Sequence, residues 1–216
     1  MKKVLVALTL VLCLLLSACS AAGGKAISDD LLKAFDGTQE EAEKLLNMTP
    51  EDSGELTGDV DPGATYARYI TVQKLCGRDM EMHITFHNDV VWTFMATSAY
   101  PMNDDTKAFA EDCYKQLQKQ FGDPYSMGTI GFPSGDFGGG SSNHEYVSGE
   151  EVTAYENFWN SEEIRGIRIA FDLPSVPENV YGSRTVNLFL YKDATEYENI
   201  QVEINLQDLD RTMFAR

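Results

Sequence analysis

The sequence is poor in basic residues. It contains 17 Lys and Arg against 34 Asp and Glu, which gives a formal net charge of -17 at pH 7. Proteins that bind DNA or RNA need basic residues to replace the counterions of the phosphates, and docking on anionic lipids needs a polybasic face. The composition therefore argues against both partners. The 43% hydrophobic and 24% charged content is otherwise that of an ordinary globular protein.

Long apolar runs are also scarce, because the sequence has only one. Lys2 and Lys3 precede residues 4–16, an uncharged and almost wholly apolar run of 13 residues. A membrane-spanning helix needs about 20 such residues, so this run is short for one and is typical of the apolar region of a signal peptide. We therefore expect the rest of the chain to lie outside the bilayer.

The apolar run ends in Leu16-Ser17-Ala18-Cys19. These residues resemble the lipobox of bacterial lipoproteins, in which an aliphatic and two small residues precede a cysteine. The resemblance implies cleavage of residues 1–18, a lipid anchor with acyl chains such as palmitate on Cys19, and a place on the outer side of the cell membrane or on the outer membrane. An ordinary cleaved signal peptide is the alternative. Cleavage would bring the charge to -19 and leave residues 19–30 as a small, polar, flexible tether.

The spacing of the cysteines is less informative about function than the N-terminal residues. The sequence has four cysteines and no CxxC pair, which argues against a redox dithiol and a zinc knuckle. Export favours a disulfide between the two cysteines behind the tether, Cys76 and Cys113. The place of Cys113 on the apolar side of a predicted helix favours a free, buried thiol instead. The sequence leaves both possibilities open.

Hydrophobic periodicity predicts an α+β fold, in which about seven strands form one or more antiparallel sheets and two main helices pack on one face. Thr38 and Glu41 form a capping box that divides the first helix into two pieces. The predicted order is α-βββ-α-ββββ. The predicted helices cover residues 29–47 and 104–121, and the predicted strands cover residues 66–76, 80–87, 90–97, 152–159, 164–173, 185–191 and 200–206.

We predict a single domain over residues 31–216, with loops over 47–63 and over the Gly- and Ser-rich stretch 124–149. The order of elements also allows two αβββ-type halves, residues 31–100 and 104–207. The two halves share no repeat at the level of residues.

Metal-ligating patterns are weak. His83 and His87 lie four apart on a predicted strand, which places them on one face but about 13 Å apart, too far for one tetrahedral ion. Each could bind an ion with acids from neighbouring strands, although exposed sheet histidines are more usual. Asp59 and Asp61 offer oxygen ligands without the spacing of an EF-hand loop. We predict no cofactor and no catalytic residues.

The remaining candidates are aromatic. Trp92 and Trp159 both fall on predicted strands, where core packing is the usual role, whereas exposed Trp or Tyr side chains would indicate a binding face. We expect a non-catalytic binding module, whose acidity favours a basic protein or peptide partner. The acidity would equally serve only to keep the protein soluble. An envelope assembly accessory and a hydrolase that uses acidic residues are the alternatives.

Overall fold

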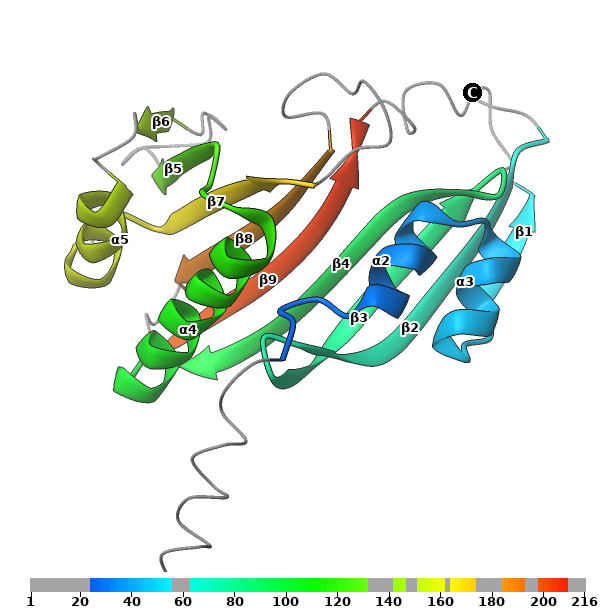
Figure 1. The fold of residues 1–216 in the computed structure, drawn as a ribbon, viewed down its shortest axis with the longest axis horizontal. Coiled ribbons are helices and arrows are strands. Elements are labelled where there is room, and N and C mark those ends of the chain that lie inside the picture. The colour runs from blue at the N-terminus through cyan, green and yellow to red at the C-terminus, as the bar shows by residue number, and fades with distance from the viewer. Residues whose placement is uncertain are drawn as a thin grey trace, which may run out of the picture.

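The computed structural model describes residues 24–55, 63–131, 142–146, 151–161, 164–173, 184–192 and 198–209. Within these residues, four helices accompany one antiparallel sheet of nine strands in the order β1-β2-β3-β4-β9-β8-β7-β5-β6 (Figure 1). The α+β prediction is confirmed. The helices are α2 (Asp29–Asp36), α3 (Gln39–Leu46), α4 (Asp104–Phe121) and α5 (Glu151–Asn160). The strands are β1 (Asp52–Glu55), β2 (Thr65–Leu75), β3 (Arg78–His87), β4 (Val90–Pro101), β5 (Ser126–Gly131), β6 (Ser142–Tyr146), β7 (Gly166–Asp172), β8 (Arg184–Lys192) and β9 (Asn199–Asp208).

The first predicted helix is divided at the expected break. The side chain of Ser28 caps α2 by accepting a hydrogen bond from the Leu31 amide at 3.2 Å. The predicted capping box opens α3, since the Thr38 hydroxyl and the Glu41 carboxylate each accept a backbone N–H of the other residue. Asn47 ends α3 in the left-handed conformation.

Strands β2, β3 and β4 form the predicted three-stranded meander. Its first turn, Cys76–Gly77, and its second turn, Asn88–Asp89, each have two consecutive residues with positive φ. Such two-residue turns match the right-handed twist of the strands that they join. Between them, alternate residues of β3 are buried, as its period of two predicts: Met80, Met82, Ile84 and Phe86.

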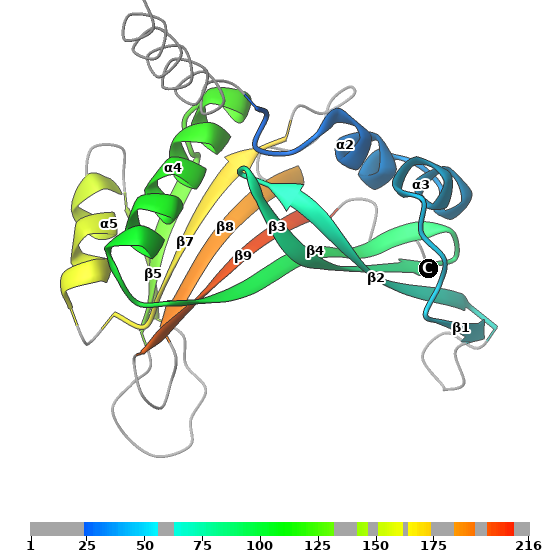
Figure 2. The same ribbon diagram turned by 90° about the horizontal axis from the view of Figure 1, so that it is seen from below.

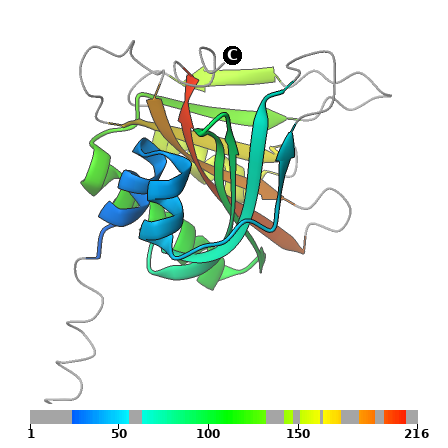
Figure 3. The ribbon, with the colours of Figure 1, turned by 90° about the vertical axis from the view of Figure 1, so that its right-hand side faces the viewer.

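All four helices pack on the same face of the sheet (Figures 2 and 3). Phe35 of α2 contacts Phe94 of β4 edge to face at 5.6 Å between ring centroids, and Tyr114 of α4 lies 6.0 Å from Phe171 of β7. Lys192 of β8 donates to the Phe158 carbonyl of α5 on this same side. The buried apolar residues of helices and strands form one core. We call the other side of the sheet the open face, which is buried locally at Ala170 of β7 and at Thr185 and Asn187 of β8.

Three segments differ from the sequence prediction. Residues 152–159 are not a strand but lie in helix α5, because the aromatic residues that suggested a strand, Tyr155, Phe158 and Trp159, share one side of a helix and pack against the core. The predicted loop 124–149 contains β5 and β6, which pair with each other and add to the edge of β7. The predicted loop 47–63 contains β1, which pairs with β2.

The two halves of the chain meet at the centre of the sheet. Strand β4 pairs with β9 in antiparallel orientation. This pair joins the meander β2-β3-β4 to the meander β7-β8-β9, whose strands follow in the reverse order, β9-β8-β7. Each half is tied to a helix of the other. Cys113 of α4 forms a disulfide with Cys76 in the β2–β3 turn, while Arg184 at the start of β8 forms an ion pair with Asp36 at the end of α2.

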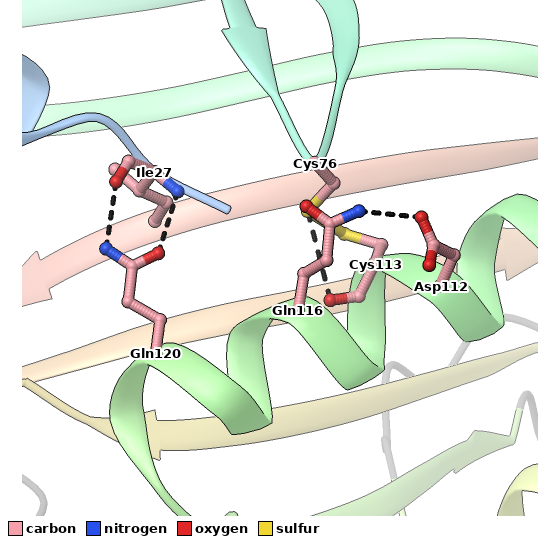
Figure 4. Close-up of a disulfide and its surroundings, with 6 residues drawn as sticks. All are labelled: Ile27, Cys76, Asp112, Cys113, Gln116 and Gln120. Atoms are coloured by element: carbon pink, nitrogen blue, oxygen red, sulfur yellow. Dashed lines mark hydrogen bonds between the residues drawn. A yellow bond between two sulfur atoms is a disulfide. The ribbon is translucent and has the colours of Figure 1, made fainter. Parts of the chain in front are cut away.

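The folded domain begins earlier than residue 31. Ala26 and Ile27, which the sequence analysis assigned to the tether, are fully buried. The Gln120 side chain of α4 accepts the Ile27 amide at 3.0 Å and donates to the Ile27 carbonyl at 2.8 Å (Figure 4). The Ala26 carbonyl accepts the Cys76 amide at 2.8 Å. The chain that precedes α2 is thus held between the β2–β3 turn and α4.

Candidate binding surface

Three exposed apolar side chains lie on the open face of the meander β2-β3-β4. Ile70 and Val72 of β2 are 48% and 65% exposed, and Trp92 of β4 is 50% exposed. Two further large apolar residues in the described part of the chain are exposed, Leu45 and Leu209. A group of exposed apolar side chains on one face is typical of an interaction site, whereas a single one is not.

A β-bulge places Trp92 on the open face. Thr85 pairs with Thr93 and the next residue, Phe86, pairs with Val91, so Trp92 is the additional residue of β4 at this point. Val91 and Phe94 on either side are both buried in the core. The indole instead stacks on the ring of His87 at 4.8 Å between centroids.

A shallow hollow of about 490 Å³ lies beside these residues. Arg68, Ile70, His83 and Thr85 line it from β2 and β3, and Asp52 lines it from β1. Arg68 donates to the Asp52 carboxylate at 2.6 Å, and this hydrogen bond holds the pKa of Asp52 below its usual value. The pair closes the edge of the hollow and leaves Ile70 as its apolar wall.

Carboxylates occupy the middle of the open face. The register places Val72 opposite Glu81, Glu81 opposite Thr97, Thr97 opposite Glu203 and Glu203 opposite Phe189, in one row across five strands. Burial raises the pKa of Glu203, and a hydrogen bond from Asn205 lowers it to a smaller extent. Glu203 forms no ion pair within the described residues.

The far side of the row is aromatic. Phe189 and Tyr191 of β8 stack at 5.6 Å between ring centroids. The Arg168 guanidinium lies 5.9 Å from the Phe189 ring, and its Nε donates to Asn187 at 2.9 Å. Burial, followed by the negative charge of Glu203, raises the pKa of Tyr191 to about 12.

The described part of the chain includes two of the four metal candidates, His83 and His87. His83 lies 3.1 Å from the Glu81 carboxylate and His87 stacks on Trp92, both on the open face. The described segments contain no group of three His, Cys, Asp or Glu that could hold a metal ion. Asp59 and Asp61 lie outside the described residues.

The two cysteines behind the tether form a disulfide, with their Cα atoms 5.0 Å apart. Cys113 is buried on the apolar side of α4 as expected, but the alternative that it is a free thiol is wrong. Cys19 lies outside the described residues, as do residues 1–18 and residues 20–23, which we predicted to be a signal peptide and the start of a tether. No helix in the described part of the chain is long and apolar enough to cross a membrane.

A second pocket, of about 390 Å³, lies between α4 and α5 and has an aromatic wall formed by Tyr114 and Tyr155. Its carboxylates include Glu111, whose hydrogen bond from Lys115 lowers its pKa. A hydrolase that uses a carboxylic acid to protonate a leaving group needs a raised pKa instead. The pocket therefore gives no support to acid catalysis by Glu111.

The sequence analysis missed Val72, Ile70 and Glu203 as site residues. Apolar residues at 70 and 72 alternate with Thr71 and Gln73, a pattern that predicts a buried face and gives the wrong side for this end of β2. Glu203 lies at one of the polar positions of a regular amphipathic strand, where an acidic residue is expected and does not indicate a site. These residues form a common surface only through the cross-strand register, which the sequence of a single strand does not reveal.

No protein-family model, curated protein or solved structure matches this chain.

Proposed function

We propose that this protein is a lipid-anchored component of the bacterial cell envelope and acts as a binding module through the open face of its sheet. The observation that supports the binding role is the grouping of Ile70, Val72 and Trp92 on that face. Apolar and aromatic side chains at the centre of an interface supply most of its binding energy. Burial of these three would remove the large exposed apolar side chains of the described strand residues from water.

The lipid anchor rests on the sequence Leu16-Ser17-Ala18-Cys19. The disulfide between Cys76 and Cys113 supports an extracytoplasmic location, because disulfides persist in oxidising compartments and are rare in the cytosol. Labelling with a palmitate analogue should be lost in Cys19→Ala and retained in Cys13→Ala, the matched control in the apolar run. Equal labelling of both variants would contradict the anchor.

The acidity of the chain favours a basic protein or peptide as partner. The carboxylates Glu51, Asp52 and Glu81 lie beside the apolar part of the open face, together with two cations, Arg68, which pairs with Asp52, and Lys74. A protein of net charge -17 also repels a second copy of itself. A partner fixed in the same membrane would make the protein an assembly accessory.

Site-specific photocrosslinking in the full-length protein tests the binding face. A photoreactive residue at Val72 or Trp92 should give a discrete adduct in cells. The same residue at Leu45 of α3, which is 39% exposed on the helical side, should not. Absence of an adduct from both open-face positions, or an equal adduct from Leu45, would refute the proposal.

A further inference from the structure

The row that crosses the open face combines two acids with apolar ends. Glu81 of β3 and Glu203 of β9 each pair with Thr97 of β4, from its opposite sides. Neighbouring strands lie about 4.8 Å apart, so the backbones at the two carboxylates are about 10 Å apart. The short Thr97 side chain leaves space between them. Val72 and Phe189 flank the pair on the outer strands.

The position of Glu203 is unfavourable for a carboxylate without a cation. It is partly buried, and the described residues place no Lys or Arg against it. Arg168 lies beyond Phe189 on the next strand, where it donates to Asn187. Desolvation of a carboxylate costs free energy unless an opposite charge compensates for it. A cation supplied from outside would provide that compensation.

Glu81 offers the second carboxylate in a different setting. It is exposed and lies 3.1 Å from the Nε2 atom of His83, so a basic side chain can approach it from solvent. The wall of the hollow beyond His83 is Ile70, which faces the same side. The row therefore presents two carboxylates at a fixed separation, with an apolar residue at one end and an aromatic residue at the other.

We propose that Glu81 and Glu203 bind two basic side chains, about 10 Å apart, of a protein segment that lies across the strands. Apolar residues of the segment contact Val72 on one side and Phe189 on the other. This inference rests on the proposed function of the open face and specifies its partner. The net charge makes anionic lipid and nucleic acid unsuitable occupants, and it also disfavours a second copy of this chain.

The test uses a designed helical peptide as the probe. Lys residues at positions i and i+7 of a helix lie about 10.5 Å apart along its axis, and Leu residues at i-4 and i+11 lie on the same side just outside them. The fluorescent peptide is titrated with the full-length protein in non-ionic detergent, and its anisotropy gives the dissociation constant. A second peptide carries Glu in place of both Lys residues.

We expect the Lys peptide to bind and the Glu peptide to bind at least tenfold more weakly. The double variant Glu81→Gln/Glu203→Gln should lose at least tenfold in affinity for the Lys peptide. The matched control Glu40→Gln/Asp105→Asn removes the same charge from exposed positions on α3 and α4 and should change the affinity less than twofold. Circular dichroism spectra check that both variants are folded.

Three results would overturn the inference: no binding of the Lys peptide, equal loss in the two double variants, or no loss in Glu81→Gln/Glu203→Gln. Crosslinking at Val72 distinguishes failure of the partner assignment from failure of the proposed binding face. An adduct from Val72 together with any of the three results would leave the binding face in place and remove only the assignment of its partner.

Discussion

The disulfide between Cys76 and Cys113 should account for a large part of the stability of the fold. The two residues are 37 positions apart, and closing a loop of that length in the unfolded chain corresponds to about 4 kcal/mol at 25 °C. For a domain of this size, that loss lowers the melting temperature by roughly 8–16 °C. We expect this decrease in Cys76→Ala/Cys113→Ala, measured by thermal and urea unfolding.

The single variants make the test sharper. Because either substitution removes the same covalent bond, Cys76→Ala and Cys113→Ala should each cost about as much as the double variant, and their effects should not add. A reducing agent should destabilise the wild-type protein by a similar amount and leave the double variant unchanged. A loss that came only from the missing sulfur atoms would instead leave the stability of the wild-type protein unchanged by the reducing agent.

The result that would refute the reasoning is a wild-type protein whose unfolding does not respond to reductant. Titration of thiols in the unfolded, unreduced protein gives an independent measurement, since neither Cys76 nor Cys113 should react. Two reactive thiols at these positions would show that α4 is held to the β2–β3 turn by packing alone.

Three further predictions concern other contacts of the fold. Arg184→Met removes the guanidinium whose Nε lies 3.0 Å from the buried Asp208 carboxylate, and should lower the free energy of unfolding by about 3–5 kcal/mol in urea titrations; a loss below about 1 kcal/mol would contradict this. Gln120→Leu leaves the buried amide and carbonyl of Ile27 without their side-chain partner, and should speed hydrogen exchange at that amide far more than exchange in the central strands. The pKa of Tyr191 is raised to about 12 from the ordinary value of 10.0, so the folded protein keeps this proton while the unfolded chain loses it. Its contribution to stability is therefore complete below pH 10 and is lost as the pH rises from 10 to 12, and Tyr191→Phe should show a shallower loss over this window.

The regular elements could be predicted because their local signals agree with their tertiary surroundings. The capping box at Thr38 and the apolar side of α4 each specify one structure, and the structure has it. The same holds for β9, whose strict alternation matches its buried side chains from Ile200 to Leu206. Here propensity, pattern and packing all favour the same conformation.

The errors arise where a partner decides the conformation. Residues 126–131 are rich in Gly and Ser, and only pairing with β7 makes them a strand. Residues 152–159 are rich in strand-forming aromatic residues, yet burial of Phe158 against the core makes them a helix. The candidate binding surface could not be predicted from the sequence for the same reason. Glu81 and Glu203 are 122 positions apart in sequence, and their common row exists only once β4 and β9 are paired.

The hydrogen bonds between Ile27 and Gln120 limit how far the open face could lie from a lipid on Cys19. Cys19 lies five positions before Gly24, a reach of about 18 Å at full extension, so a lipid on Cys19 would keep the β2–β3 turn close to the membrane. Strand β3 runs from that turn over 10 residues, or about 33 Å, to the turn beside Trp92. Val72 would then lie near the lipid surface and the Trp92 indole near the outer tip. With β3 directed away from the bilayer, the open face would point sideways, toward neighbours in the same envelope layer.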